Sequence, residues 1–312
     1  MRTFAYERAR DVEHATRLGS ETEATFLGGG TNLVDLMRLG VERPALVIDV
    51  TGLGHDRIEE TDDGGLRIGA AVRNSDLAAD SRVQSRYQGL SSALLHGASG
   101  QLRNMATTAG NLLQRTRCAY FQDVTRPCNK RDPGSGCPAR DGEHRNLAIL
   151  GWSEQCVATH PSDMAVSLVA FDAVVHTSRR SLLVEALYRP PDGDPSRETV
   201  LERGELIEAV ELPALPAGSN SLYLKVRERA SFSFAVVSVA AVLSDGDMRI
   251  ALGGVAHKPW RARRAEQALR EGADFAEAAE AELEEARPLR DNAYKVKLAR
   301  NLIVQALEEL AR

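Results

Sequence analysis

The chain is short of the features that define several large classes of protein. It has 312 residues, of which only four are cysteine, aromatic residues make up 5%, and the formal net charge is -5. This slightly acidic balance argues against a polyanion-binding surface, so nucleic acid is not an expected partner. No stretch approaches the roughly 20 apolar residues of a membrane span, and residues 1–20 lack the apolar region of a signal peptide. We therefore expect no membrane span and, by default, a cytoplasmic location.

What the chain does contain is an alternation of helix-like and strand-like segments without repeats, typical of a mixed α and β protein of two or three packed units. The first zone has a helix at 11–20, a strand that runs through glycines into a helix, and a buried strand at 45–50. The second zone extends to about residue 213, where a Pro/Gly/Ser-rich joint begins. The third zone opens with strands at 221–230, 233–243 and 248–256 and closes with two amphipathic helices. The last helix places apolar residues on one face, which predicts core packing: Val296, Leu302, Ile303, Ala306 and Leu310.

The glycine run "FLGGGTNL" is the first chemical signal. Backbone without Cβ approaches a phosphate closely, so Gly28, Gly29 and Gly30 are candidates for a pyrophosphate cradle. No Gly-Lys-Ser/Thr follows, and Leu33 stands where a dinucleotide fingerprint needs its last glycine. A turn without function remains the alternative for this run alone.

Two further segments strengthen the phosphate interpretation. Residues 107–111, "TTAGN", combine small residues with hydroxyl and amide groups that suit a second stretch of the same phosphates. Ser162 and Asp163 precede an apolar helix, where an ordinary N-cap and first-turn carboxylate is the alternative to a ligand-binding role.

All four cysteines lie between residues 118 and 156, separated by nine, eight and eighteen residues. The absence of a C-x-x-C pair counts against structural zinc without excluding it, and disulfides are scarce in a large protein with its own core. Unrelated buried thiols would be spread along the chain. A four-thiolate metal site on an irregular loop remains, and an iron–sulfur cluster is its best chemical match. The expected ligands are Cys118, Cys128, Cys137 and Cys156.

Six segments in order carry a family resemblance. "FLGGGTNLVDLM", "TTAGNL", "THPSDMAVSLVA", "LERGELIEAVELP", "YLKVRERASFSFAVV" and "GGVAHKPWRA" together resemble the FAD-binding subunit of the xanthine dehydrogenase family of molybdenum hydroxylases. The match extends over nearly the whole chain. "RTRCAYFQDVTRPCNKRDPGSGCPAR" is similar to the branch typified by bacterial periplasmic aldehyde oxidoreductase, whose flavin subunit carries an additional [4Fe–4S] cluster.

The resemblance implies an α+β fold: a vanillyl-alcohol-oxidase (PCMH)-like FAD-binding fold in two subdomains, then a C-terminal α+β domain with a small antiparallel sheet. The FAD-binding domain would cover residues 1–215, with subdomain 1 at about 1–55 and subdomain 2 at about 56–215. Subdomain 2 would include the iron–sulfur loop 112–156. The C-terminal domain would cover 216–312.

Carried over by position, the resemblance assigns FAD-binding roles. The glycine run and the TTAGN segment would hold the pyrophosphate from two sides, Asp163 would hydrogen-bond the cofactor, Ile207 would approach the isoalloxazine, and Lys225 would lie near the polar edge of the ring. The family often has glycine where this chain has Ala109. The full expected set is Leu27, Gly28, Gly29, Gly30, Thr31, Asn32, Leu33, Thr107, Thr108, Ala109, Gly110, Asn111, Gln114, Ser162, Asp163, Ile207 and Lys225.

The implied function is an electron-transfer flavin subunit of a molybdenum-dependent aldehyde oxidoreductase or xanthine dehydrogenase-type complex, with cofactors FAD and [4Fe–4S]. The organic substrate would be oxidised on another chain, so no catalytic residue is expected here. Partners would be a molybdopterin-binding large subunit, a [2Fe–2S] small subunit and an external electron acceptor. Export with a signal-bearing partner would place such a subunit in the periplasm. The alternative within the family is the flavin subunit of a 4-hydroxybenzoyl-CoA reductase-like complex. Outside it, the alternatives are a stand-alone flavin oxidoreductase, a zinc-stabilised binding module and an assembly subunit without FAD.

Overall fold

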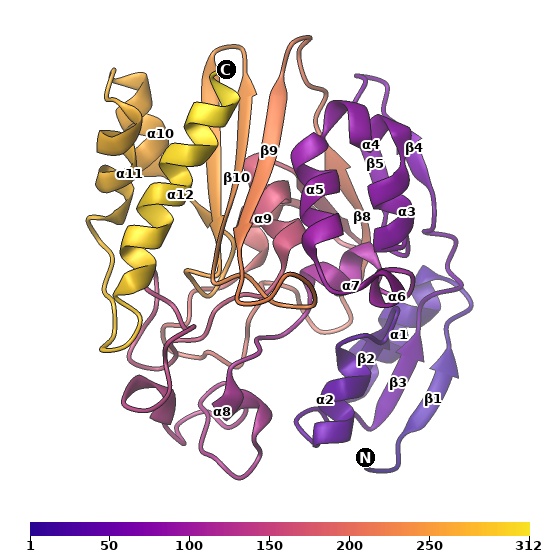
Figure 1. Cartoon of the computed structure of the whole chain (residues 1–312). Helices are drawn as coiled ribbons and strands as arrows, with labels where there is room; N and C mark the ends of the chain where they lie inside the picture. Colours follow the sequence, from indigo (N-terminus) through magenta and orange to yellow (C-terminus); the bar gives the residue numbers. More distant parts are fainter.

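The computed structural model describes residues 1–312 and contains three sheets with helices packed against them (Figure 1). The N-terminal unit is a three-stranded parallel sheet in the order β1-β3-β2. The Asp11 side chain begins its first helix by accepting a hydrogen bond of 2.7 Å from the His14 N–H. The elements of this unit are β1 (Ala5–Arg8), α1 (Val12–Glu21), β2 (Ala24–Leu27), α2 (Leu33–Leu39) and β3 (Leu46–Asp49).

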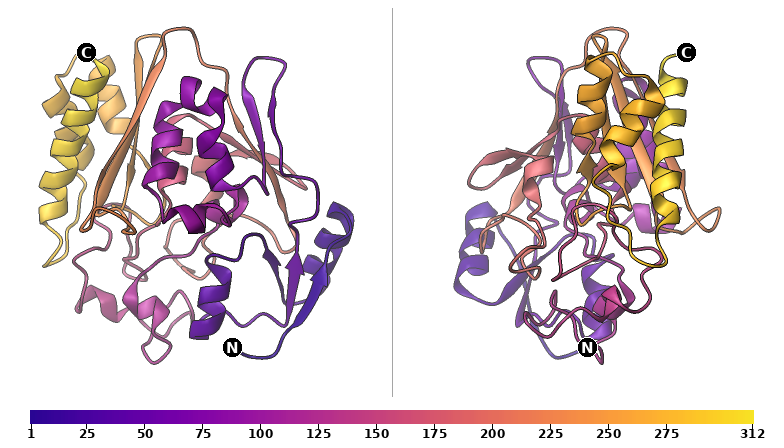
Figure 2. Two further views of the ribbon diagram at one scale, coloured as in Figure 1. Left: turned by 45° about the vertical axis from the view of Figure 1, so that its right-hand side comes forward. Right: turned by 90° about the vertical axis from the view of Figure 1, so that its left-hand side faces the viewer.

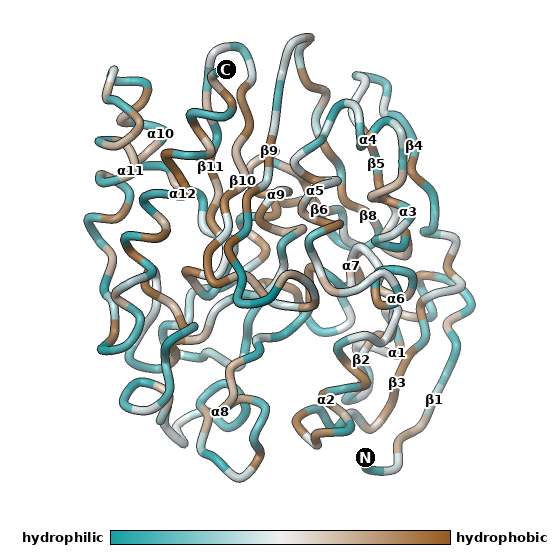
Figure 3. The backbone as a smooth tube through the Cα atoms, in the orientation of Figure 1, coloured by the Kyte–Doolittle hydropathy of each residue, from teal (hydrophilic) through white to brown (hydrophobic).

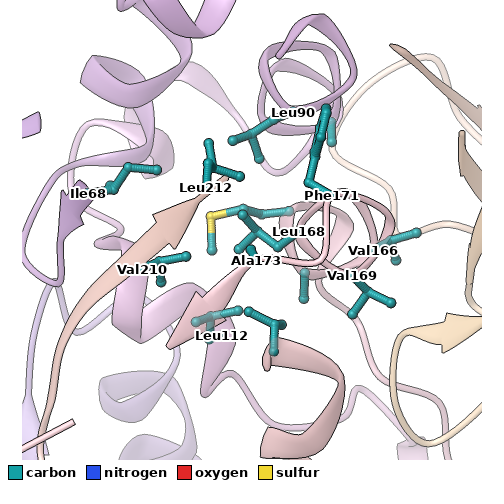
Figure 4. Packing of buried hydrophobic residues seen from close by; sticks show 14 of the residues in the cluster. Ile68, Leu90, Leu112, Val166, Leu168, Val169, Phe171, Ala173, Val210 and Leu212 are labelled. Carbon is teal, nitrogen blue, oxygen red and sulfur yellow. The ribbon is translucent and has the colours of Figure 1, made fainter. Parts of the chain in front are cut away.

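The second unit is built on a five-stranded antiparallel sheet in the order β4-β5-β8-β6-β7. Leu168 of helix α9 lies in the same hydrophobic core as Val210 and Leu212 of β8, and this core is the largest in the chain (Figure 4). The strands are β4 (Ile58–Glu60), β5 (Leu66–Gly69), β6 (Val174–Thr177), β7 (Ser181–Leu183) and β8 (Ile207–Leu212). The α-helices are α3 (Asn74–Ala79), α4 (Ser81–Arg86), α5 (Gln88–His96), α6 (Gly100–Arg103), α7 (Thr108–Leu112) and α9 (Asp163–Ala170). A short 3-10 helix, η2, spans Val184–Leu187.

A long irregular segment, residues 113–162, connects α7 to α9 and carries every cysteine. Its only helical turns are α8 (Ala119–Gln122) and the 3-10 helix η1 (Pro138–Arg140). The segment runs beneath the C-terminal sheet and beside the N-terminal unit, and most of it is hydrophilic (Figure 3).

The C-terminal unit is a four-stranded antiparallel sheet in the order β12-β11-β10-β9, with three helices on one face (Figure 2). The predicted strands at 221–230 and 233–243 are shorter in the structure, and residues 227–236, which include a charged Arg-Glu-Arg run, form a loop between them. The elements are β9 (Asn220–Val226), β10 (Val237–Ser244), β11 (Asp247–Gly253), β12 (Trp260–Arg261), α10 (Arg263–Arg270), α11 (Phe275–Leu283) and α12 (Tyr294–Leu310).

Both faces of this C-terminal sheet are buried. On one face, α12 packs with Leu302, Ile303, Ala306 and Leu310 in a core shared with α10 and α11, with Val296 at its edge, so the predicted apolar stripe is confirmed as core. On the other face, sheet residues, among them Tyr223 and Val242, join the core formed by residues 66–212. The α+β class and the antiparallel C-terminal sheet expected from the sequence are therefore confirmed. The limits at residues 55 and 215 stay predictions.

No helix combines the length and the apolar character that crossing a lipid bilayer requires.

One fully buried lysine ties α12 to the irregular segment. The Lys295 ammonium donates hydrogen bonds to the backbone oxygens of Asn146, Leu147 and Gly254, at 3.2, 2.9 and 2.5 Å. No carboxylate pairs with it, and burial lowers the pKa of Lys295 to about 7.

Replacing Lys295 with methionine is expected to remove part of the pH dependence of folding stability. A lysine in the unfolded chain has a pKa of about 10.4, so above about pH 7 the unfolded state binds a proton that the folded state does not. Wild-type stability should therefore rise with pH in this window, by up to about 1.4 kcal/mol per pH unit, relative to Lys295→Met. Urea unfolding at several pH values from about 7 to 9 measures this difference. Lys297→Met alters an exposed lysine two residues away and should keep the wild-type slope; an unchanged slope in Lys295→Met would contradict the prediction.

Candidate functional site

The glycine run forms a tight turn between β2 and α2 that presses against a second backbone segment. A Cβ placed on Gly29 would lie 1.8 Å from the carbonyl oxygen of Met105, and one on Gly28 would lie 2.7 Å from Thr107 Oγ1. Real Cβ atoms do not approach other atoms this closely, so the two segments can touch only because these positions carry no side chain. The two small-residue segments singled out in the sequence are therefore brought together.

Replacing Gly29 with valine should separate these segments. The new Cβ would meet backbone and not a movable side chain, so we expect a loss of about 1–3 kcal/mol of stability together with at least a tenfold loss of FAD affinity. Chemical unfolding of the flavin-free chain and fluorescence titration with FAD measure the two effects. Gly100→Ala is the matched control, because a Cβ there would meet nothing closer than the Arg103 side chain at 4.0 Å. Unchanged flavin binding in Gly29→Val would show that the turn faces away from the cofactor.

The second segment is held by its own hydroxyl and amide groups. Thr107 begins α7 by accepting from the Gly110 N–H at 3.3 Å. Thr108 is fully buried, and its hydroxyl donates to the Val72 carbonyl at 3.1 Å. Asn111 Oδ1 accepts from the Ser162 hydroxyl at 2.5 Å, which connects this segment to the start of α9.

Ser162 is the N-cap of α9, since its Oγ also accepts from the Ala165 N–H at 3.0 Å. The ordinary capping interpretation is thus correct for the serine. Its hydrogen bond to Asn111 adds a structural tie that the sequence did not reveal.

Two large cavities meet at these segments. The first, of about 390 Å³, lies along the glycine turn. The second, of about 460 Å³, lies between α5, the start of α9 and the C-terminal sheet. Thr31, Asn32 and Gly110 line both cavities. Each volume falls in the range of small-molecule and cofactor sites, and an elongated ligand that filled both would pass the two small-residue segments at its middle.

Most of the expected binding residues line one of the two cavities. The first is lined by Gly28, Gly29, Gly30, Leu33, Thr107, Ala109 and Ile207, and the second by Asn111, Gln114, Ser162, Asp163 and Lys225. Leu27 and Thr108 line neither, because Leu27 ends strand β2 and Thr108 is turned toward Val72.

Ile207 and Lys225, both expected beside the same ring, line different cavities. Ile207 begins β8, behind the glycine turn, whereas Lys225 lies near the end of β9. The structure thus gives them different surroundings, and their expected positions beside one ring stay a prediction.

A buried ion pair forms one wall of the second cavity. Lys225 Nζ lies 2.7 Å from Asp163 Oδ2 and donates a further bond of 3.1 Å to the His96 carbonyl. The side chains of Lys225 and Asp163 are 1% and 8% exposed, so this pair is shielded from water and from salt. The Tyr223 hydroxyl donates to Asp163 Oδ1 at 2.5 Å. Burial and the Asp163 charge raise the pKa of Tyr223 well above its usual value, so the phenol remains a hydrogen-bond donor.

Three buried polar atoms of residues that line the second cavity have no hydrogen-bond partner within the chain: Asn74 Oδ1, His160 Nε2 and Ser238 Oγ. Buried polar groups in native proteins are nearly always paired. Unsatisfied atoms gathered around one cavity therefore fit a site that binds a polar ligand. Burial lowers the pKa of His160 to about 4, so its ring is neutral at physiological pH.

The four cysteines surround one small enclosed space within the irregular segment. Cys118, Cys128, Cys137 and Cys156 all line it, none forms a disulfide, and its free volume of about 10 Å³ is close to that of one water molecule. No three His, Cys, Asp or Glu side chains converge on a point in a way that would hold a single metal ion. Cys118 also lines the second large cavity, so the thiol site and that cavity are adjacent.

The surroundings of the sulfur atoms act in two opposite directions on the thiol pKa values. Burial raises the pKa of Cys118 to about 11 and also raises that of Cys137 and Cys156. Backbone N–H groups directed at the sulfurs oppose this rise, and Lys130 does so at Cys156. Such N–H donors stabilise thiolate charge and influence the potential of iron–sulfur clusters.

A partly buried charge network joins the cysteine segment to its neighbours. The Arg115 guanidinium pairs with Glu42, which follows α2, and with Glu198 at 2.8 Å. Lys130 Nζ lies 3.3 Å from the same Glu198 carboxylate. Burial favours neutral Glu198, but the two cations outweigh it and lower the pKa of this carboxyl group. The network fixes the segment against the N-terminal unit.

Two family models match the chain in sequence. A model described as the FAD binding domain in molybdopterin dehydrogenase matches residues 2–215. A model of the CO dehydrogenase flavoprotein C-terminal domain matches residues 222–310.

Relatives of known name match over most of their length. The aldehyde oxidoreductase FAD-binding subunit PaoB of Escherichia coli (strain K12) is 53% identical over 316 residues, which cover 99% of this chain and 98% of that protein. The glyceraldehyde dehydrogenase medium chain of Sulfolobus acidocaldarius is 26% identical over 273 residues, covering 85% of this chain and 80% of that protein.

Solved structures share the fold. A chain of carbon monoxide dehydrogenase from Hydrogenophaga pseudoflava superposes with a TM-score of 0.74 at 24% identity, covering 98% of this chain and 96% of that one. Quinoline 2-oxidoreductase from Pseudomonas putida 86 gives a TM-score of 0.72 at 20% identity, covering 99% and 97%. With the family models, these likenesses confirm the FAD-binding fold followed by a C-terminal domain that the sequence predicted.

Proposed function

The chain belongs to the FAD-binding medium subunits of the xanthine dehydrogenase and CO dehydrogenase family, and from this membership we propose how its cavities and its thiols serve an oxidoreductase of the aldehyde oxidoreductase type. The observation that carries the proposal is the pair of large cavities that meet at Thr31, Asn32 and Gly110. A dinucleotide has the matching form, with a pyrophosphate at its middle and a ring system at each end.

In this proposal, the first cavity holds the adenosine half of FAD and the second holds the isoalloxazine. Thr31, Asn32 and Gly110 line the junction, and Gly28 to Gly30 line the first cavity next to it, where close approach to a pyrophosphate needs residues without bulky side chains. Ile207 then packs against the adenosine half, and Asp163 and Lys225 bind the polar edge of the flavin ring. The unpaired atoms around the second cavity support an occupant with polar atoms at its edge, as the isoalloxazine has.

Bound FAD supplies the capacity to accept a pair of electrons and to release them singly or together. The chain's own residues bind and orient the ring and exclude water from it. The Lys225 ammonium places positive charge beside the ring, which favours a form that carries negative charge. No group of this chain is needed to oxidise the organic substrate, since that step belongs to a partner.

We propose that the four cysteines hold a [4Fe–4S] cluster. Four thiols around one space, with backbone N–H groups directed at the sulfurs, supply a donor set of the right number and kind. Because Cys118 lines both the thiol space and the proposed flavin cavity, the cluster would be a near neighbour of the ring.

The proposed partners are a molybdopterin-binding large subunit and a [2Fe–2S] small subunit, which would deliver electrons from aldehyde oxidation to this chain for transfer to an external acceptor. The aldehyde class rests on the relative that is 53% identical. The same relative disfavours the 4-hydroxybenzoyl-CoA reductase alternative.

The test is the metal and flavin content of the protein purified without oxygen, together with its partner subunits. We expect about one FAD and about four iron atoms per chain, beyond the iron of the small subunit, with broad brown absorbance. Zinc in place of this iron, with FAD present, would overturn the cluster and retain the flavin role. Purified protein that neither contains nor takes up FAD would overturn the proposed function itself.

A further inference from the structure

A serine hydroxyl without a partner faces the proposed ring cavity. Ser238 is fully buried in the middle sheet strand β10, lines the second cavity, and makes no hydrogen bond within the chain through Oγ. A buried hydroxyl left unpaired destabilises a folded protein, so its presence needs an explanation. We propose that Ser238 is a ligand-binding residue, whose hydroxyl donates a hydrogen bond to a carbonyl oxygen on the imide edge of the bound ring. This inference rests on the proposed FAD-binding function.

The position of Ser238 in the sheet places its side chain beside the ion pair on the wall of the second cavity. Across the antiparallel sheet it pairs with Lys225 of β9 on one side and with Gly253 of β11 on the other. Paired residues in neighbouring strands point to the same face, so Ser238 and Lys225 are directed to the same side of the sheet. A Cβ on Gly253 would lie 2.3 Å from Ser238 Oγ, and the missing side chain therefore leaves the space that the hydroxyl occupies.

Hydrogen-bond accounting shows what this wall can still bind. An ammonium has three donors, and Lys225 uses two of them, on Asp163 and on the His96 carbonyl. The Asp163 carboxylate accepts one bond at each oxygen, from Tyr223 and from Lys225, and keeps further lone pairs. With the free hydroxyl of Ser238, the wall thus offers two donors and one acceptor.

That inventory matches one edge of the isoalloxazine. Its pyrimidine ring carries an imide, in which an N–H donor lies between two carbonyl acceptors. Two donors and one acceptor on the protein are the complement of this group. The adenine and the ribose of FAD contain no imide, so the match selects the flavin end of the cofactor for the second cavity.

Tyr223 is the positioning residue of this wall. It does not line the cavity, but its hydroxyl holds Asp163, and it lies two residues before Lys225 on the same face of β9. The Ser238 hydroxyl also lies near the phenol: an interaction between these two side chains opposes the rise in the pKa of Tyr223, although no well-aligned hydrogen bond joins them. A Ser238 hydroxyl that turned to Tyr223 when ligand is bound would be a rival to the proposed contact.

The experiment replaces Ser238 with alanine in the full chain and measures two quantities, the stability of the flavin-free protein and its affinity for FAD. We expect the stability to stay the same or rise and the affinity to fall. In the flavin-free protein, loss of an unpaired hydroxyl should leave the urea midpoint unchanged or raise it. Titration with FAD should show a dissociation constant about three- to tenfold higher, the effect of one hydrogen bond, and a shifted flavin absorption band. Binding of ADP, which lacks the ring, should be unaffected. Ser238→Cys retains the shape of the side chain with a weaker donor and should fall between serine and alanine.

Ser244→Ala is the control, because Ser244 ends the same strand and its hydroxyl is already paired with Ser219 at 3.0 Å. It should leave FAD affinity unchanged. Wild-type FAD affinity and an unshifted spectrum in Ser238→Ala would overturn the inference while leaving FAD binding intact. A lower urea midpoint for flavin-free Ser238→Ala would also overturn it, by showing that the hydroxyl is bonded within the chain. Failure of the wild-type chain to bind FAD would instead overturn the proposed function.

Discussion

Lys225→Met is expected to destabilise the chain by about 3–5 kcal/mol, because it leaves the buried Asp163 carboxylate without its cation. Tyr223 still donates to that carboxylate, but a phenol does not neutralise its charge. FAD affinity should fall at least tenfold, since the variant also loses the free donor of the ammonium. Urea unfolding of the flavin-free chain and fluorescence titration with FAD measure the two effects separately.

A double variant distinguishes loss of a pair from general damage to the core. Asp163→Asn added to Lys225→Met removes the stranded charge, so part of the lost stability should return even though FAD affinity does not. Arg300→Met is the surface control: its partner Glu280 is 61% exposed, and its removal should change stability by less than about 1 kcal/mol. Equal losses in the single and double variants would show that Lys225 acts through packing and not through its charge.

Cys128→Ser is expected to abolish the proposed iron–sulfur cluster and to leave FAD bound. A serine oxygen is a poor substitute for a thiolate ligand, and the cluster has no fifth cysteine to replace it. Iron beyond that of the small subunit should fall from about four atoms per chain to nearly none, with loss of the brown absorbance. Flavin content should stay near one per chain, because Cys128 does not line either large cavity.

Ser135→Ala is the matched control in the same loop. Its hydroxyl accepts a hydrogen bond of 3.0 Å from the Cys128 backbone N–H, so the variant loosens the loop without removing a thiol. We expect it to retain its iron. Full iron content in Cys128→Ser, or loss of flavin while iron remains, would contradict the assignment of these cysteines.

The parts of the site that the sequence predicted depend on local patterns. Three glycines between a strand and a helix, and four cysteines crowded into one irregular segment, are visible without knowledge of long-range contacts. The structure brings the glycine turn against residues 105–107 and places all four thiols around one space, as the patterns indicated. The sequence does not determine which metal group the four cysteines would hold, because four thiolates can bind more than one kind of metal.

The parts that the sequence could not predict depend on strand register. Tyr223 and Ser238 read as ordinary strand residues, and their importance arises only because β9 and β10 pair so that both adjoin the Asp163–Lys225 pair. The cavity that Ile207 lines has the same origin, since nothing in "GELIEAV" states which cavity the start of β8 adjoins. The Pro/Gly/Ser-rich segment after Leu212 resembles a domain boundary. It does not indicate that strands of the C-terminal sheet contribute residues to the hydrophobic core formed by residues 66–212.

The shared core has a consequence for how the protein is made. A ribosome delivers the chain from its N-terminus, so residues 66–212 emerge while the C-terminal sheet that covers part of their core is still unsynthesised. Until β9 to β11 appear, apolar surface of α5 and α9 is left open to solvent, a state prone to aggregation that chaperones normally guard. The wall formed by Lys225, Ser238 and Gly253 is also among the last parts to be translated. In the proposed site, flavin insertion would therefore follow the completion of the chain.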